Sequence, residues 1–248
     1  MPANQSAQPS LHVIRPNGWD TRVGNVMRNG LPSTGRRLST EQREKQIVAA
    51  AISFFAERGF DGQLRDLAKN IGVTHTLLYH YFPTKQALIE RVFSELVQNR
   101  WKPEWDVLID SRSMAVPDKF LAFYSDYLET VLTYEFTRIV IYSGLNSAAN
   151  ERFFLERFFE MLRERLFPRL IRETRRHHKI NTRAKPTSRE IELLVGLHGG
   201  IFYFALRRFV YGQKLHDAQS ATADIGYLRD RISAYLISWK DVIHGIKT

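Results

Sequence analysis

The chain of 248 residues contains no cysteine, which excludes disulfide bonds, cysteine nucleophiles and thiolate metal sites. It also has no long hydrophobic run. The longest apolar stretch, near residues 193–206, is interrupted by His198 and by glycines, and it is too short to span a bilayer. The amino terminus lacks an apolar signal core. We therefore expect a cytoplasmic protein.

Sequence motifs of common enzymes are missing as well. The chain has no Gly-x-Ser-x-Gly, no phosphate-loop pattern, no Gly-x-Gly-x-x-Gly and no His-Glu-x-x-His. Acidic and basic residues are scattered without a recognisable catalytic arrangement. We therefore expect no enzymatic activity, no cofactor and no metal. An all-helical enzyme is the alternative, because the absence of a motif is weak evidence.

Positive charge is in excess, with a formal net charge of +10 and a pI near 9.9. Such a charge favours a polyanionic partner, but both halves of the chain carry it, so charge alone does not locate the binding face. The stretch 163–189 is the most basic. It fits an anionic ligand group, a second nucleic-acid segment, or simply a solvated helix face and loop.

Helical patterns with glycine turns follow one another over residues 39–83. Ile47, Ala50, Ala51 and Phe54 recur at intervals of three and four, which predicts a helix that Ser39 caps and Gly59 ends. A short helix over about 63–70 and another over about 75–82 follow, separated by Gly72 and with Thr74 as a cap. Two short helices joined by a glycine turn are typical of a helix-turn-helix.

This segment resembles the DNA-binding domain of the tetracycline-repressor (TetR) family over roughly residues 43–95. The resemblance rests on the runs 54–60 (FFAERGF), 66–68 (DLA), 71–73 (IGV) and 78–82 (LYHYF), and on Lys85 and Leu88. One departure lies between the first two helices. The segment 61–64 (DGQL) is a residue shorter than usual and lacks the hydroxyl cap, so Asp61 or Gly62 is expected to cap the second helix.

The resemblance implies double-stranded operator DNA as a partner and assigns the residues that meet it. Arg65, His75, Thr76 and Leu77 are expected to face the floor of the major groove, where the Thr76 and Leu77 methyls meet thymine methyls. Tyr79, Tyr81 and Lys85 are expected to contact phosphates, which set position without reading bases. The complete set of expected DNA contacts is Arg65, Thr74, His75, Thr76, Leu77, Tyr79, Tyr81 and Lys85.

We divide the chain into an extension over 1–38, a helix-turn-helix domain over 39–83 and a helical domain over 84–248. The extension is rich in polar residues, lacks apolar periodicity and carries several arginines, so we expect a disordered tail or a basic arm that touches DNA. Thr84 is expected to start a linking helix that runs to about Arg100. The expected fold is all-α throughout.

The helical domain is expected to bind a ligand and to dimerise. Pro103 and Pro117 are interpreted as the ends of a loop or short turn. Helices are expected over 118–134, around 138–145, over 150–178 with a kink at Pro168, over 188–211 and at the carboxyl end. In the last helix, eight apolar residues recur at intervals of three and four, and this stripe needs a partner surface. They are Ile225, Leu228, Ile232, Tyr235, Leu236, Trp239, Val242 and Ile243.

The resemblance assigns the last two helices, over 188–211 and 227–246, to the interface of a homodimer. Packing within one chain is the alternative for the stripe. The dense aromatic residues of the helical domain suit an apolar or aromatic effector, although most of them could be ordinary core. The candidate ligand-binding residues are Trp105, Phe123, Tyr127, Tyr142, Phe158, Met161, His198 and Phe202.

The sequence thus predicts a ligand-responsive, sequence-specific DNA-binding transcriptional regulator, and more specifically a repressor that a small molecule releases from its operator. The alternative is a DNA-binding dimer whose second domain binds a protein partner or only dimerises.

Overall fold

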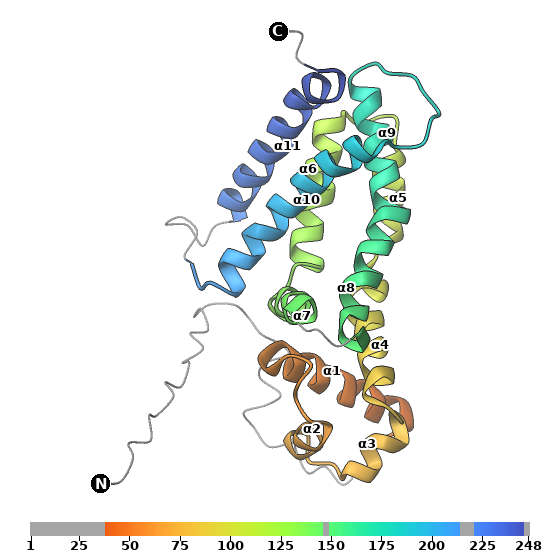
Figure 1. Cartoon of the computed structure of the whole chain (residues 1–248), viewed down its shortest axis with the longest axis vertical. Coiled ribbons are helices and arrows are strands. Elements are labelled where there is room, and N and C mark those ends of the chain that lie inside the picture. Colours follow the sequence, from red (N-terminus) through yellow and green to blue (C-terminus); the bar gives the residue numbers. More distant parts are fainter. Residues whose placement is uncertain (1–37, 146–148, 214–220, 246–248) are drawn as a thin grey trace, which may run out of the picture. The chain divides into compact units, whose positions relative to one another are not determined.

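The computed structural model describes residues 38–145, 149–213 and 221–245 (Figure 1). This part of the chain folds into helices and turns without a β-strand, which confirms the all-α fold. The arginines of the expected amino-terminal extension lie outside the described residues. One continuous hydrophobic core runs through the described helices. The division of the chain at residues 38 and 83 stays a prediction.

The first helix, α1 (Thr40–Arg58), begins and ends as its sequence predicts. Ser39 accepts a hydrogen bond from the Gln42 amide, and the Gln42 side chain accepts one from the Ser39 amide, so both ends of a capping box are present. Gly59 terminates the helix with φ of +68°, a conformation that favours glycine. The apolar face of α1 is buried in the core.

The turn before α2 (Leu64–Asn70) differs from the expected one. Neither Asp61 nor Gly62 caps the helix: the capping position is Gln63, whose side chain makes no capping hydrogen bond. A Cβ atom at Gly62 would lie 2.5 Å from Cε1 of Phe54. Gly62 is therefore needed because the chain passes directly over an aromatic ring of α1.

The third and fourth helices are capped by the predicted threonines. Thr74 Oγ1 accepts the Leu77 amide at the start of α3 (His75–Tyr81), and Thr84 Oγ1 accepts the Ala87 amide at the start of α4 (Lys85–Leu96). The linking helix ends earlier than expected, and a 3₁₀ turn over Gln98–Arg100 (η2) follows it.

A helix occupies the segment that the sequence analysis interpreted as a loop. α5 (Pro103–Asp110) begins at Pro103, and α6 (Val116–Thr130) has Pro117 in its first turn. Proline suits the first turn of a helix because the amide hydrogen that it lacks has no partner there. Both prolines therefore mark helix starts rather than the ends of a loop.

The long helical segment after residue 149 is interrupted, as expected, but one turn before Pro168. α7 (Tyr134–Leu145) is followed by α8 (Ala149–Met161), a π-helical turn over Leu162–Leu166 (η3), and α9 (Phe167–His177). Proline removes one backbone hydrogen bond and crowds the preceding turn. The irregularity is accordingly a π turn before the proline, a feature that often accompanies functional sites.

The last two helices are α10 (Ser188–Phe209) and α11 (Ala221–His244), and Figure 1 shows α11 running beside α6 and α10. The expected role of the α11 stripe as a dimer seam is wrong for its central residues. Five stripe residues are buried within this chain, namely Leu228, Ile232, Tyr235, Leu236 and Trp239. Periodicity predicted correctly which face is buried but not that α6 and α10 cover it.

Much of the basic stretch 163–189 is paired with acidic residues of the same chain. Asp106 and Asp110 on α5 bind arginines of the π turn and α9, namely Arg165, Arg169 and Arg172. Arg175 forms a buried ion pair with Glu190 and donates to the Ala184 carbonyl, which holds the loop after α9. Most of the α9 arginines thus hold helices together.

Candidate functional site

The expected DNA-reading helix α3 presents polar and aromatic side chains to solvent. His75, Thr76 and His80 are exposed, and so is Tyr79, at 39%. The rings of His75 and Tyr79 contact each other edge to face, with centroids 4.5 Å apart. Leu77 is half-buried, while Leu78 is fully buried and holds the helix on the core. α3 therefore has one anchored face and one open face.

The remaining expected DNA contacts have mixed surroundings. Arg65 is exposed in the first turn of α2. Tyr81 is half-buried and packs against the core. The Lys85 ammonium donates a hydrogen bond to the Phe60 carbonyl oxygen in the turn after α1. Lys85 therefore ties α4 to that turn, and its role toward phosphate stays a proposal.

Five of the expected ligand-binding residues come together in a buried aromatic cluster. Trp105 contacts Phe123 at 5.4 Å and Tyr127 at 6.0 Å between ring centroids, and Tyr127 contacts His198 at 5.3 Å. Phe158 lies 6.5 Å from His198. The structure adds two residues that the sequence analysis did not select, Tyr124 and Phe167. We define the aromatic cluster as Trp105, Phe123, Tyr124, Tyr127, Phe158, Phe167 and His198.

His198 is the polar centre of this cluster. Its Nε2 lies 3.4 Å from the Tyr127 hydroxyl, whereas its Nδ1 has no hydrogen-bond partner among the described residues. The hydroxyl of Tyr124 also has no hydrogen-bond partner among the described residues, and its ring centroid is 6.0 Å from that of His198. Burial lowers the pKa of His198 to about 4, so the ring is neutral at pH 7. Burial also raises the pKa of Tyr124.

The other expected ligand-binding residues are placed differently. Met161 and Phe202 are half-buried against the core. Tyr142 lies at the contact between α7 and α1, where its ring is close enough to Gly59 that a Cβ there would be 3.1 Å away. The Tyr142 hydroxyl accepts a hydrogen bond from Arg138 at 2.8 Å. Tyr142 thus belongs to the junction with the helix-turn-helix rather than to the aromatic cluster.

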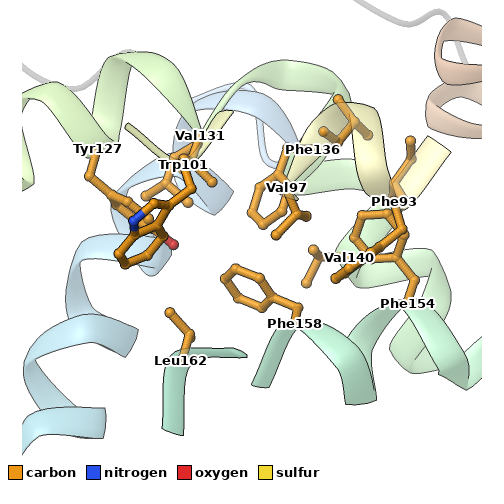
Figure 2. Packing of buried hydrophobic residues seen from close by; sticks show 14 of the residues in the cluster. Phe93, Val97, Trp101, Tyr127, Val131, Phe136, Val140, Phe154, Phe158 and Leu162 are labelled. Atoms are coloured by element: carbon orange, nitrogen blue, oxygen red, sulfur yellow. The ribbon is translucent and has the colours of Figure 1, made fainter. Parts of the chain in front are cut away.

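A row of phenylalanines connects the aromatic cluster with the helix-turn-helix (Figure 2). The ring centroids of Phe158 and Phe136 are 5.1 Å apart, and those of Phe136 and Phe154 are 6.2 Å apart. Phe154 in turn lies 5.2 Å from Phe93 of α4 and 6.4 Å from Phe60 after α1. The sequence does not reveal this row, because periodicity shows that these rings are buried but not which rings they contact.

In the part of the chain that the structure describes, no helix combines the length and apolarity that crossing a membrane requires. The described residues also include no group of histidine, aspartate and glutamate side chains that is arranged to hold a metal ion.

Comparison with known proteins agrees with this geometry. Residues 47–92 match the family model of bacterial regulatory proteins, tetR family. The transcriptional regulator RutR of Escherichia coli strain K12 is 33% identical over 74 residues, or 29% of this chain and 35% of RutR. The chain thus spans about a third of the length of this curated relative.

Solved structures share the fold over most of the chain. A TetR-like regulator from Rhodococcus sp. RHA1 aligns with a TM-score of 0.61 at 16% identity, covering 81% of this chain and 99% of that one. FadR from Bacillus subtilis, solved in complex with stearoyl-CoA, aligns with a TM-score of 0.55 at 16% identity, covering 82% of this chain and 98% of that one. The chain is thus similar to bacterial regulatory proteins of the tetR family over its helix-turn-helix segment, and it shares the fold of TetR-like regulators over most of its length.

Proposed function

We propose that this chain is a sequence-specific transcriptional regulator that binds operator DNA as a homodimer. The observation that carries the proposal is the open face of α3 within the matched segment 47–92. Exposed hydroxyls, imidazoles and a half-buried leucine on a short helix suit the major groove. In this proposal Arg65, Thr76 and Leu77 meet bases, and Tyr79, Tyr81 and Lys85 meet phosphates. The protein then acts in the cytoplasm, on bacterial DNA.

The homodimer that we propose uses the exposed faces of the last two helices. On α10 these faces include Gly196, Gly199 and Tyr203, and on α11 they include Ser233 and Ile237. Ile237 is 76% exposed in the single chain, although it is a large apolar residue. Small residues allow helices to approach closely, and an isologous interface would bury each Ile237 against the partner. Two copies of α3 would then reach major grooves about 34–36 Å apart, or a multiple of this.

We further propose that a small molecule bound at the aromatic cluster releases the operator. A ligand shifts an equilibrium only if it binds one arrangement of the protein better than the other. The row of phenylalanines supplies a packed connection from Phe158 to Phe60 and Phe93. A second connection runs through Arg100, which ends the 3₁₀ turn after α4 and donates to the Thr130 carbonyl at the end of α6.

One solved structure with this fold, FadR from Bacillus subtilis in complex with stearoyl-CoA, supports a ligand-binding role by analogy. The competing function is a DNA-binding dimer whose helical domain binds only protein. Calorimetry with a candidate effector, with and without operator DNA, separates the two. A coupling of about 1–3 kcal/mol would weaken operator and effector binding reciprocally by roughly 5- to 150-fold. Equal effector affinity in both titrations would favour the competing function.

A further inference from the structure

His198 and Tyr124 form a polar pair inside the aromatic cluster. Both side chains are at least nine-tenths buried, and Nδ1 of His198 and the hydroxyl of Tyr124 have no hydrogen-bond partner among the described residues. Buried polar atoms in folded proteins are nearly always paired, and leaving one unpaired is costly. Two such atoms on neighbouring rings of α6 and α10, with centroids 6.0 Å apart, therefore point to a molecule that bonds to both.

The charges of the core are already satisfied within the chain. The buried charged side chains of the described residues form two ion pairs, Lys119 with Glu173 at 2.6 Å and Arg175 with Glu190 at 2.5 Å. His198 itself is surrounded by uncharged rings from α6, α8 and α9. A carboxylate or phosphate buried here would lack a cationic partner, and burying an unpaired charge is far more costly than burying a neutral polar group.

We propose that the effector is an uncharged aromatic molecule with a hydrogen-bonding group, such as an amide or a phenol, that bridges Tyr124 and His198. The surrounding rings bind its aromatic part, and the two polar atoms bind its functional group. An amide suits the pair because it offers both a donor and an acceptor. This inference rests on the proposed function, since it names the chemical class that the regulatory site accepts.

The ligand class is tested on the full-length chain with matched probes. Benzamide and phenol represent the proposed class, benzoate its anionic counterpart, benzylamine its cationic counterpart, and toluene the ring alone. A wider set of one- and two-ring amides, each paired with its carboxylate, allows for differences in size. Ligand-observed NMR at millimolar concentration reports binding without DNA. We expect neutral polar members to bind at least tenfold more tightly than their charged counterparts.

The variant Tyr124→Phe isolates the hydroxyl, because it removes one oxygen and leaves the ring. We expect it to weaken binding of the best neutral probe by roughly two- to tenfold, as expected for the loss of one neutral hydrogen bond. Tyr235→Phe is the matched control: Tyr235 is also buried, but its hydroxyl lies 3.2 Å from Thr174 Oγ1. This control should lower stability and leave probe affinity unchanged.

Three results would overturn the inference: no amide or phenol of the set binds, charged members or stearoyl-CoA bind better, or Tyr124→Phe leaves affinity unchanged. Each of these leaves operator binding and the proposed function intact. The proposed release of operator DNA by an effector fails separately if a neutral probe binds in a Tyr124-dependent way but does not alter operator affinity.

Discussion

The Arg138 guanidinium on α7 donates a hydrogen bond from Nε to the Ala56 carbonyl oxygen near the end of α1, at 2.6 Å. The last carbonyls of a helix lack partners within it, and a cation there is favourable. The same guanidinium bonds to Tyr142, whose ring packs on Gly59. One side chain thus joins the helix-turn-helix to the helical domain.

We expect Arg138→Gln to weaken this junction. The free energy of unfolding should fall by about 1–3 kcal/mol, because a charge-assisted hydrogen bond is lost in a half-buried site. If the junction transmits the effector signal, the ratio of operator affinities with and without effector should also move toward one. Urea unfolding and fluorescence anisotropy measure the two effects. Arg112→Gln is the control, since Arg112 is exposed on the surface. Equal behaviour of both variants would contradict the role of Arg138.

At the DNA face, Tyr79→Phe and Lys85→Ala should weaken operator binding in different ways. Tyr79→Phe removes a neutral hydrogen bond, so affinity should fall roughly two- to tenfold with an unchanged salt dependence. Lys85→Ala removes a charge, so the slope of log affinity against log salt should flatten by about one unit. Because Lys85 also bonds to Phe60, its variant must be shown to be folded at the assay temperature. Identical salt slopes for both variants would refute a phosphate contact by Lys85.

Gly62→Ala should destabilise the helix-turn-helix. The added Cβ would lie 2.5 Å from the Phe54 ring, so the ring or the turn must move, at a cost of about 1–3 kcal/mol. Gly144→Ala on α7 is the matched control, because its Cβ would meet Leu155 at an ordinary 3.4 Å. The control should be neutral or should gain up to about 1 kcal/mol from helix propensity. Thermal unfolding compares the two, and equal melting temperatures would show that the close approach at Gly62 is unimportant.

The free energy of unfolding should decrease as the pH falls from 6.5 toward 4, because His198 is buried in its neutral form. Burial lowers its pKa from 6.5 to about 4, so the unfolded chain binds the proton more tightly than the folded chain. The folded state therefore has its full stability above pH 6.5. It loses stability as the pH falls toward 4, because the unfolded chain takes up the proton first. We expect a loss of roughly 1 kcal/mol per pH unit in this window.

Urea unfolding of wild type and His198→Gln at several pH values tests this dependence. The variant should lose most of the slope between pH 6.5 and 4. His178→Gln is the control: burial also lowers the pKa of His178, but this side chain is only partly buried. A slope that His198→Gln leaves unchanged would show that the ring is not neutral and buried in solution.

Ile237→Glu should convert the proposed dimer into a monomer, because a charge would face its own copy across an isologous interface. Light scattering at micromolar concentration measures the mass. Val107→Glu on α5 is the matched control, since Val107 is similarly exposed, at 73%, but lies outside the proposed interface. A wild-type chain that stays monomeric with and without DNA would refute the dimer.

The helix-turn-helix could be predicted closely because its signals are local. Ser39, Thr74 and Thr84 each cap the helix that follows them, and a cap depends only on residues within one turn. The α5 helix was missed because Pro103 is compatible with a loop and with a helix start, and only packing of Trp105 decides between them.

The sequence does not show which helices pack against one another. The α11 stripe has the same period whether it faces α6 or a second subunit, so Leu228 and Trp239 could not be assigned. Part of the aromatic cluster could be predicted, because many aromatic residues on amphipathic helices indicate a buried core. Its pairing of Tyr124 with His198 joins residues distant in the chain, which no local pattern encodes.

The central claim is that α3 reads operator DNA in the major groove. Selection of bound sequences from random double-stranded DNA by the purified full-length chain tests it most directly, with Arg65→Ala and Leu77→Ala run in parallel. We predict enrichment of a near-palindrome with half-sites one helical turn, or a multiple of it, apart, and a changed base preference in each variant. No enriched sequence, or one that neither variant alters, would contradict the account.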